Sequence, residues 1–210
     1  EAEYLQPLGT LGQTLSTRTM GRGGNGTNGH PKSVLVELKG VDRLYPMYGT
    51  IELEGGGDVQ DLLPVADGLP GAVADPDLLA RLGIQVGDEL AVGDTRIQLR
   101  GVIQRAPDRV MEFFSLGPRL MISAEAFRHT GLMQPGSLFR VEYLLRLPDN
   151  SAPRVAESIR SAFPEAGWRV RDYAHAAPRV RTVLERLSVD LTLVGLGALL
   201  VGGLGIAGGV

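Results

Sequence analysis

The sequence contains no cysteine among its 210 residues. This absence excludes disulfide bridges and metal sites built on thiolates, and it leaves the redox compartment open. Aromatic residues are also scarce, at 5%, and the net charge is only −3. Nucleic-acid-binding proteins usually carry a basic surface with interleaved aromatic side chains. Because neither feature is present, we expect no nucleic-acid partner.

Charge is absent from one long stretch, residues 191–210. Its twenty residues comprise twelve aliphatic residues, seven glycines and one threonine. As a helix this stretch would be about 30 Å long, close to the thickness of the hydrocarbon core of a bilayer. A buried core helix is the alternative, but core helices of this length usually carry a polar face. We therefore predict a transmembrane helix, truncated by the chain end. With a first residue, Glu1, that is not methionine, we expect a fragment of a longer protein.

A stalk is predicted to lead into this helix. Pro178 suits the first turn of a helix, and no helix breaker follows it before the apolar run. Residues 176–190 combine an apolar stripe with charged side chains, which we interpret as the solvated face of a helix that approaches a membrane. The stalk and the transmembrane segment are therefore predicted to form one continuous helix.

The glycines of the apolar run permit two interpretations. Residues 203–208 match the G-x-G-x-x-G pattern of dinucleotide-binding folds. That pattern should follow a short strand, whereas here it follows a long apolar run, and its acidic position would fall beyond residue 210. Small residues in membrane helices instead allow a neighbouring helix to approach closely. We predict no cofactor, and we predict helix packing at Ala198, Gly202, Gly205 and Gly209.

Upstream of the stalk, the sequence alternates between strand and helix patterns. Period-two alternation and short apolar runs predict strands, and helical spacing after a capping residue or proline predicts helices. The expected N-caps include Asp75 and Ser123. These patterns predict an α+β domain. Its strands are expected at 10–20, 33–41, 50–53, 72–74, 119–122, 138–147 and 168–172, and its helices at 76–82, 123–129 and from Pro153. A hairpin is expected at 87–103, with its turn at Gly93-Asp94 and with Glu89, Arg96, Gln98 and Arg100 on its polar face.

The residues that could carry out chemistry do not form a recognisable site. Ser115 and Ser123 lack the G-x-S-x-G context of a nucleophile. The glycine-rich loop 21–31 lacks the G-K-S/T ending of a phosphate loop. No carboxylate follows a histidine at metal-ligand spacing, and the histidines are far apart in the sequence, at His30, His129 and His175.

Two acidic pairs could perform acid–base work, but turn chemistry explains them better. Asp75 and Asp77 flank Pro76, and Asp88 and Glu89 follow a glycine. We therefore predict no catalytic, metal-binding or cofactor-binding residue.

Three stretches resemble a known family. Residues 186–207 run from a charged helix end through Leu-Thr-Leu-Val to a Gly-Gly-Leu-Gly-Ile core. This resembles the second transmembrane segment of FtsX-like ABC transporter permeases of the MacB and LolC/LolE type. Residues 34–49 and 114–137 are similar to the narrower group of YbbP-type permeases. The resemblance covers nearly the whole chain.

The resemblance implies a domain organisation. Residues 1–175 would form an extracytoplasmic, MacB-like periplasmic α+β domain with an inserted β-rich part at about 70–117. Residues 176–190 would be the stalk, and residues 191–210 the truncated second transmembrane helix. The full-length protein would be a multi-pass protein of the bacterial inner membrane, with residues 1–190 extracytoplasmic.

The resemblance also implies a function and partners. A cytoplasmic ABC ATPase would hydrolyse ATP, and the permease, itself not an enzyme, would couple hydrolysis to export or membrane extraction of a hydrophobic or lipid-linked substrate. Two permease halves would form a dimer or pseudo-dimer, and a periplasmic partner is a further expectation. The alternative is a single-span, membrane-anchored binding or scaffold domain without a transport role.

Overall fold

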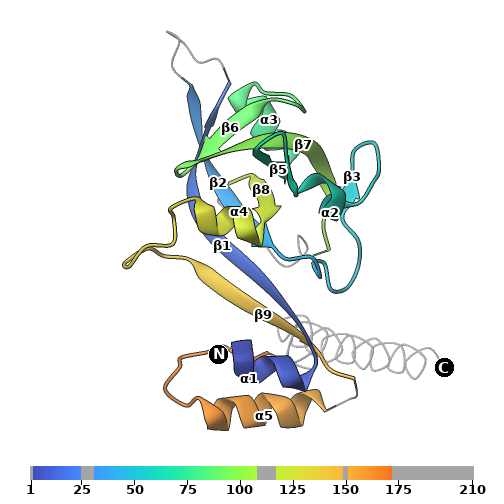
Figure 1. The fold of residues 1–210 in the computed structure, drawn as a ribbon, viewed down its shortest axis with the longest axis vertical. Helices are drawn as coiled ribbons and strands as arrows, with labels where there is room; N and C mark the ends of the chain where they lie inside the picture. The colour runs from blue at the N-terminus through green and yellow to red at the C-terminus, as the bar shows by residue number, and fades with distance from the viewer. Residues whose placement is uncertain (1, 25–30, 108–116, 149–150, 172–210) are drawn as a thin grey trace, which may run out of the picture. The chain divides into compact units, whose positions relative to one another are not determined.

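The computed structural model describes residues 2–24, 31–107, 117–148 and 151–171. The chain divides into two compact units, Glu1–Arg146 and Leu147–Val210. The described elements of the first unit are shown in Figure 1 and follow in chain order: α1 (Ala2–Leu5), the 3-10 helix η1 (Gln6–Leu8), β1 (Thr10–Gly23), β2 (Lys32–Val41), β3 (Glu52–Leu53), α2 (Val59–Leu62), β4 (Val65–Ala66), β5 (Leu69–Ala74), α3 (Pro76–Leu82), β6 (Glu89–Val92), β7 (Thr95–Arg105), β8 (Arg119–Ser123), α4 (Ala124–His129) and β9 (Arg140–Arg146).

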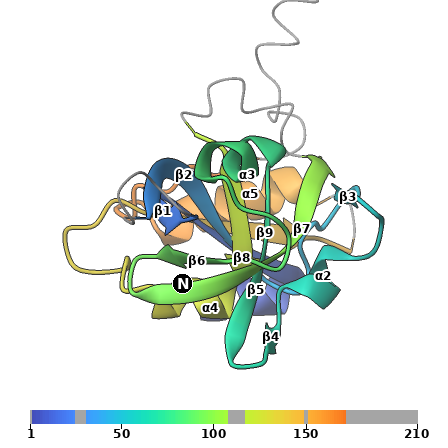
Figure 2. The same ribbon diagram turned by 90° about the horizontal axis from the view of Figure 1, so that it is seen from above.

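Six strands of the first unit close into a barrel. Neighbouring strands follow the order β7-β6-β1-β2-β8-β5, and β5 pairs in turn with β7. The pairings of β2 with β8 and of β5 with β7 are parallel, and the other four are antiparallel. Figure 2 shows these strands from above. Closure gives every barrel strand a neighbour on both sides, so these strands are protected from pairing with another chain. The expected insert at about 70–117 therefore contributes β5, β6 and β7 to the same sheet as β1 and β2, and its status as a separate part stays a prediction.

Alternating apolar residues fill the barrel. Leu15 of β1, Leu38 of β2 and Leu99 of β7 belong to one buried cluster to which all six barrel strands contribute. Phe127 of α4 and Leu82 of α3 belong to the same cluster, so both helices pack their apolar sides into the barrel core. A second cluster lies on the opposite faces of β5 and β8, where Val73 and Met121 pack with residues of the 45–63 segment.

Most of the predicted elements are confirmed, and so is the α+β class. The predicted hairpin is β6 and β7, with Val92 opposite Thr95 and positive φ at Gly93. The helix predicted at 76–82 is α3, and it ends at Gly83 in the left-handed conformation. The helix predicted after Ser123 is α4, and the Ser123 hydroxyl caps it by accepting a hydrogen bond from the Ala126 amide at 3.1 Å.

The predicted role of Asp75 is wrong in one respect. Asp75 occupies the N-cap position of α3, but its side chain makes no capping hydrogen bond. Its Oδ2 instead accepts from the Arg119 amide at 3.0 Å, and its own amide donates to the Arg119 carbonyl at 3.0 Å. The carboxylate thus extends the β5–β8 ladder by one residue, because β5 ends beside the start of β8. This buried tertiary contact replaces the local cap.

The described part of the second unit is a helix and the segment after it. Helix α5 (Ala152–Ala162) starts near the predicted Pro153. The strand predicted at 168–172 is wrong for residues 168–171, which form no strand. Instead the Trp168 ring packs on Phe163 with 4.6 Å between ring centroids, and Arg160 donates to the Val170 carbonyl at 3.4 Å.

The predicted stalk and transmembrane helix, residues 176–210, lie outside the described residues, as does Asp172. Within residues 2–24, 31–107, 117–148 and 151–171, no helix has the length and apolar character needed to cross a membrane.

One arginine holds the β4–β5 hairpin against β7. The Arg100 guanidinium donates through Nη1 to the carbonyls of Leu62 and Pro64, at 3.3 and 2.6 Å, and through Nη2 to those of Ala66 and Leu69, at 3.1 and 3.0 Å. Its Nε also donates to a glutamine side chain of the same strand at 3.0 Å. Because a planar guanidinium can reach several acceptors at once, this residue fixes a segment that has little regular structure of its own.

Replacing Arg100 with methionine keeps the length of the side chain and removes all of these donors. We expect the free energy of unfolding to fall by about 2 kcal/mol, because the carbonyls lose charge-assisted hydrogen bonds. The matched control is Arg96→Met on the same strand, where the side chain is 76% exposed and lies 3.7 Å from Glu89. An exposed ion pair contributes at most about 1 kcal/mol. Urea unfolding measures both, and equal losses would show that the carbonyl contacts contribute little.

Candidate functional site

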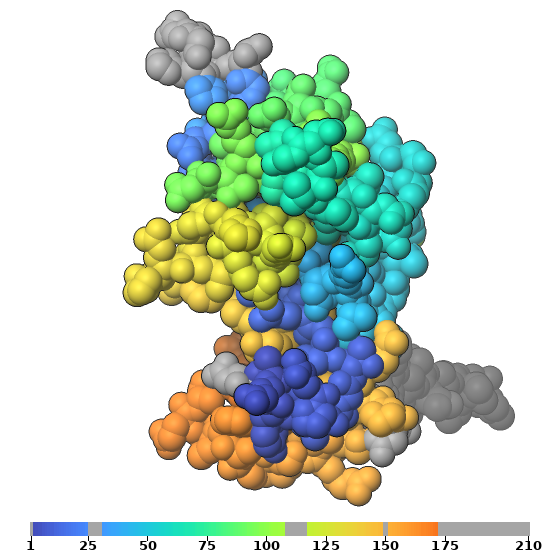
Figure 3. Space-filling model, in the orientation of Figure 1, coloured from blue at the N-terminus to red at the C-terminus, as the bar shows by residue number. Residues whose placement is uncertain are grey.

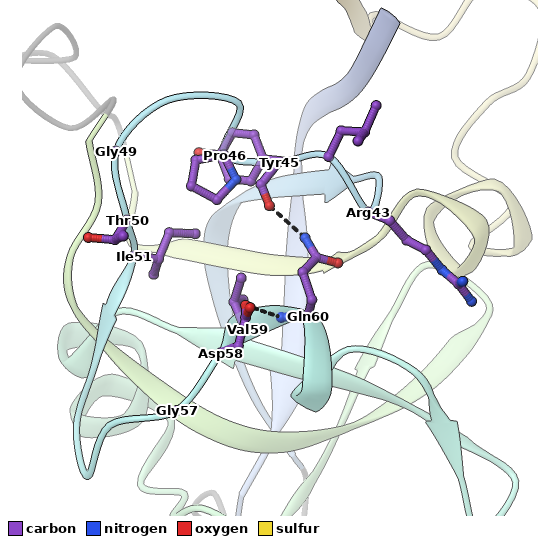
Figure 4. Close-up of a pocket in the computed structure, with 11 residues that line it drawn as sticks. Arg43, Tyr45, Pro46, Gly49, Thr50, Ile51, Gly57, Asp58, Val59 and Gln60 are labelled. Carbon is purple, nitrogen blue, oxygen red and sulfur yellow. Dashed lines mark hydrogen bonds between the residues drawn. The ribbon is translucent and has the colours of Figure 1, made fainter. Parts of the chain in front are cut away.

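A pocket of about 380 Å³ lies in the first unit, between the segment after β2 and the start of α2. Figure 4 shows its walls. Pockets that bind small molecules usually have volumes of about 300 to 1,000 Å³, so this one is large enough for a small ligand or for one group of a larger ligand. Its lining consists of Arg43, Leu44, Tyr45, Pro46, Gly49, Thr50, Ile51, Gly57, Asp58, Val59 and Gln60.

The pocket has an apolar base and a polar rim. Tyr45, Ile51 and Val59 are 6%, 8% and 2% exposed, so they belong to the buried cluster outside the barrel and form a fixed base. Polar groups come from Arg43, Thr50, Asp58 and Gln60, and Arg43 extends away from the other labelled side chains (Figure 4). Polar and apolar groups contribute about equally to this lining, so it is suited to a ligand that carries both. The pocket is therefore a candidate binding site.

One side chain ties the two walls together. The side-chain Nε2 of Gln60, on α2, donates to the carbonyls of Asp42 and Tyr45 at 3.0 and 2.6 Å. The Asp58 carboxylate caps α2 by accepting a hydrogen bond from the backbone amide of Gln60 at 2.9 Å. The Tyr45–Pro46 peptide bond is cis. The ammonium group of the buried Lys39, on β2, lies 4.8 Å from the centre of the Tyr45 ring.

No protein-family model matches the chain. The chain is similar, however, to individual proteins of ABC-type transporters. Over 103 residues the chain is 35% identical to an uncharacterized ABC transporter permease, YbbP, of Escherichia coli strain K12. The expected resemblance to YbbP-type permeases is confirmed. The match spans 49% of this chain and 12% of the length of YbbP, so the chain corresponds to a small part of that relative.

Two solved structures share the fold. The extracellular domain of YknZ, a noncanonic ABC-type transporter from Gram-positive bacteria, matches with a TM-score of 0.50 and 9% identity, over 80% of this chain and 83% of that chain. The periplasmic region of MacB from Actinobacillus actinomycetemcomitans matches with a TM-score of 0.52 and 13% identity, over 85% of this chain and 76% of that chain. The expected MacB-like fold is therefore confirmed.

The predicted helix-packing residues Ala198, Gly202, Gly205 and Gly209 lie outside the described residues, and so do His30, Ser115 and His175. Of the remaining candidates for chemistry, Ser123 caps α4, and Asp88 Oδ2 accepts from the Gln85 amide at 2.8 Å within a turn. The turn interpretation of Asp88 is confirmed.

Sequence reasoning missed the pocket. Residues 45–49 and 55–57 contain the proline and glycine residues that are typical of turns and loops, and this pattern alone does not indicate a binding site. The available signal was the unusual density of turn residues around a strand of only two residues, β3. That signal indicates an irregular surface segment, and it does not indicate that α2 closes a cavity over this segment.

Proposed function

We propose that this chain is the extracytoplasmic domain of an ABC transporter permease, with the stalk and second transmembrane helix following it. The observation that carries the proposal is the 35% identity to the permease YbbP. The fold shared with the extracellular domain of YknZ and the periplasmic region of MacB supports it. The proposed boundaries are residues 1–175 for the domain, 176–190 for the stalk and 191–210 for the membrane helix.

In this proposal the protein is a multi-pass protein of the bacterial inner membrane and is not itself an enzyme. A cytoplasmic ABC ATPase hydrolyses ATP, and the permease couples hydrolysis to export or membrane extraction of a hydrophobic or lipid-linked substrate. Two permease halves assemble as a dimer or pseudo-dimer, with a periplasmic partner as a further component. The pocket between the 43–51 segment and α2 is the candidate contact for an apolar part of the substrate, because its base is apolar.

The partner ATPase gives the decisive test. The full-length protein, tagged and extracted from native membranes in mild detergent, should co-purify with an ABC ATPase in stoichiometric amount, identified by mass spectrometry. The same preparation should show additional membrane helices by protease mapping. A full-length protein with a single span and no associated ATPase would instead support the anchored binding or scaffold domain.

The continuous helix predicted from Pro178 into the membrane makes a second test possible. Insertion of Gly-Gly after Ser188 introduces a flexible point, since each glycine costs about 1 kcal/mol in a helix interior. We expect the ATPase to keep its basal rate and to lose its coupling to transport. Insertion of Ala-Ala at the same place adds equal length and preserves helical propensity. Loss of coupling only with the glycines supports a rigid stalk, and full coupling with both insertions contradicts it.

A further inference from the structure

One pair of strands in the first unit joins β9 to the barrel strand β1. The first half of β1 pairs antiparallel with β9, from Thr10 opposite Arg146 to Ser16 opposite Arg140 (Figure 1). At the outer end of this pair the backbones are in close contact, because a Cβ added to Gly9 would lie 2.3 Å from the Arg146 carbonyl oxygen. We call residues 10–16 and 140–146 the stem. In the described sheet β9 pairs with β1 alone, so only this ladder joins it to the barrel strands.

The segment that follows β2 is bonded to the β1 side of the stem. Asp42 Oδ2 accepts a hydrogen bond from the backbone amide of Gln13, and Oδ1 accepts from the amide of Leu44 at 3.0 Å. Met47 lies over the same strand, since its terminal methyl group is 3.1 Å from the position that a Cβ of Gly12 would occupy. This segment therefore lies against β1 at two adjacent residues of the stem and is hydrogen-bonded to one of them, Gln13.

The same segment is bonded to the β9 side of the stem. The Arg146 guanidinium donates through Nη2 to the Met47 carbonyl, and its carbon lies 4.9 Å from the centre of the Tyr48 ring. A cation placed in this way over an aromatic ring is attracted by the negative face of the ring. Residues 42–48, which we call the latch, thus contact both stem strands.

The latch is also a wall of the pocket. Residues 43–46 line the pocket, and the side-chain Nε2 of Gln60, on the opposite wall, donates to the carbonyls of Asp42 and Tyr45. A displacement of β1 at Gln13, or of β9 at Arg146, therefore moves the pocket wall. We propose that the latch couples the shape of this pocket to the separation of the two stem strands, so that opening of the stem opens the pocket and a ligand in the pocket resists opening. The proposal depends on the proposed function only for the source of the motion, which would reach the stem from the membrane.

A disulfide across the stem tests the coupling. Residues 1–210 contain no cysteine, so Leu11→Cys with Leu145→Cys, which are register partners, introduces one possible bridge within this part of the protein, and any cysteine elsewhere in the full-length protein is replaced by serine. In the full-length protein, hydrogen–deuterium exchange of peptides covering residues 43–51 is measured with the bridge oxidised and reduced. We expect oxidation to slow this exchange about tenfold, because local openings of the latch should require an open stem. Peptides from residues 95–103 report any change in global stability.

Arg146→Met in the same double-cysteine background breaks the latch contact with β9. In that variant oxidation should change exchange of residues 43–51 by less than about twofold. The matched control is Arg140→Met on the same strand, whose exposed side chain lies 3.9 Å from Glu142, and it should retain the full effect. The proposal is overturned if the bridge leaves exchange unchanged with Arg146 present, or slows it equally in Arg146→Met. No nucleotide or ATPase enters the experiment, so its outcome is independent of the transport proposal.

Discussion

Replacing Gly71 with alanine should lower the free energy of unfolding by about 3 kcal/mol or more, because the added methyl group has no space. A Cβ at this position would lie 1.8 Å from the Leu62 carbonyl oxygen and 2.8 Å from Arg100 Nη1. Main-chain atoms would have to move to relieve the first contact. The strand cannot shift easily, since β5 pairs with both β7 and β8 and the Gly71 amide donates to the Leu63 carbonyl at 3.2 Å.

The control for Gly71 is another strand glycine whose neighbour can move. A Cβ at Gly12 would meet the terminal methyl group of Met47 at 3.1 Å, and a methionine side chain can change rotamer. We expect Gly12→Ala to cost less than about 1 kcal/mol. Urea unfolding followed by far-ultraviolet circular dichroism measures both variants. Similar losses in the two would show that the clash at Gly71 is relieved without the backbone shift.

Phe127→Ala should cost about 3 to 5 kcal/mol, because it leaves a cavity in the barrel core. Phe127 is fully buried and is the largest side chain in the interior cluster. Its ring lies against β2 where Gly40 has no side chain, and a Cβ there would be 2.7 Å from the Phe127 Cβ. The barrel strand and the helix thus fit through a pair of residues, one without a side chain and one with a large ring.

The control for Phe127 lies on the segment between α4 and β9, which projects from the surface in Figure 3. Leu138 on this segment is 93% exposed. Its replacement by alanine should change stability by less than about 0.5 kcal/mol. Thermal or urea unfolding measures the loss of stability in Phe127→Ala and in Leu138→Ala. A small effect of Phe127→Ala would mean that α4 contributes little to the stability of the barrel, contrary to its burial.

The elements that could be predicted from the sequence are those determined by local residues. The β6–β7 hairpin follows from alternation around Gly93-Asp94, and α4 follows from Ser123 as its cap. The barrel could not be predicted in the same way. Its closure depends on the parallel pairings of β2 with β8 and of β5 with β7, between strands separated by long stretches of sequence. Alternation indicates which face of a strand is buried, and it does not identify the neighbouring strand.

The wrong or missing predictions also result from contacts that local residues do not determine. Residues 168–171 alternate like a strand, but their partners in the structure are the side chains of Phe163 and Arg160. Asp75 has the local signature of a cap, but a neighbouring strand brings the Arg119 amide within reach of its carboxylate. The pocket forms because Gln60 reaches two carbonyls of a turn 15 to 18 residues earlier. Tertiary contacts override the local preference in each case, and a single sequence does not display them.

The stem has a mechanical consequence. Thr10 and Arg146 lie opposite each other at the same end of the β1–β9 ladder. A force that pulls Thr10 and Arg146 apart, across the strands, therefore loads one hydrogen bond of the ladder at a time, whereas a force along the strands would load all of them together. We expect the ladder to open at a lower force when its strands are pulled apart than when they are pulled along their length. With Arg146 at the end of the ladder that is loaded first, its contacts with Met47 and Tyr48 are among the first to break under such a pull.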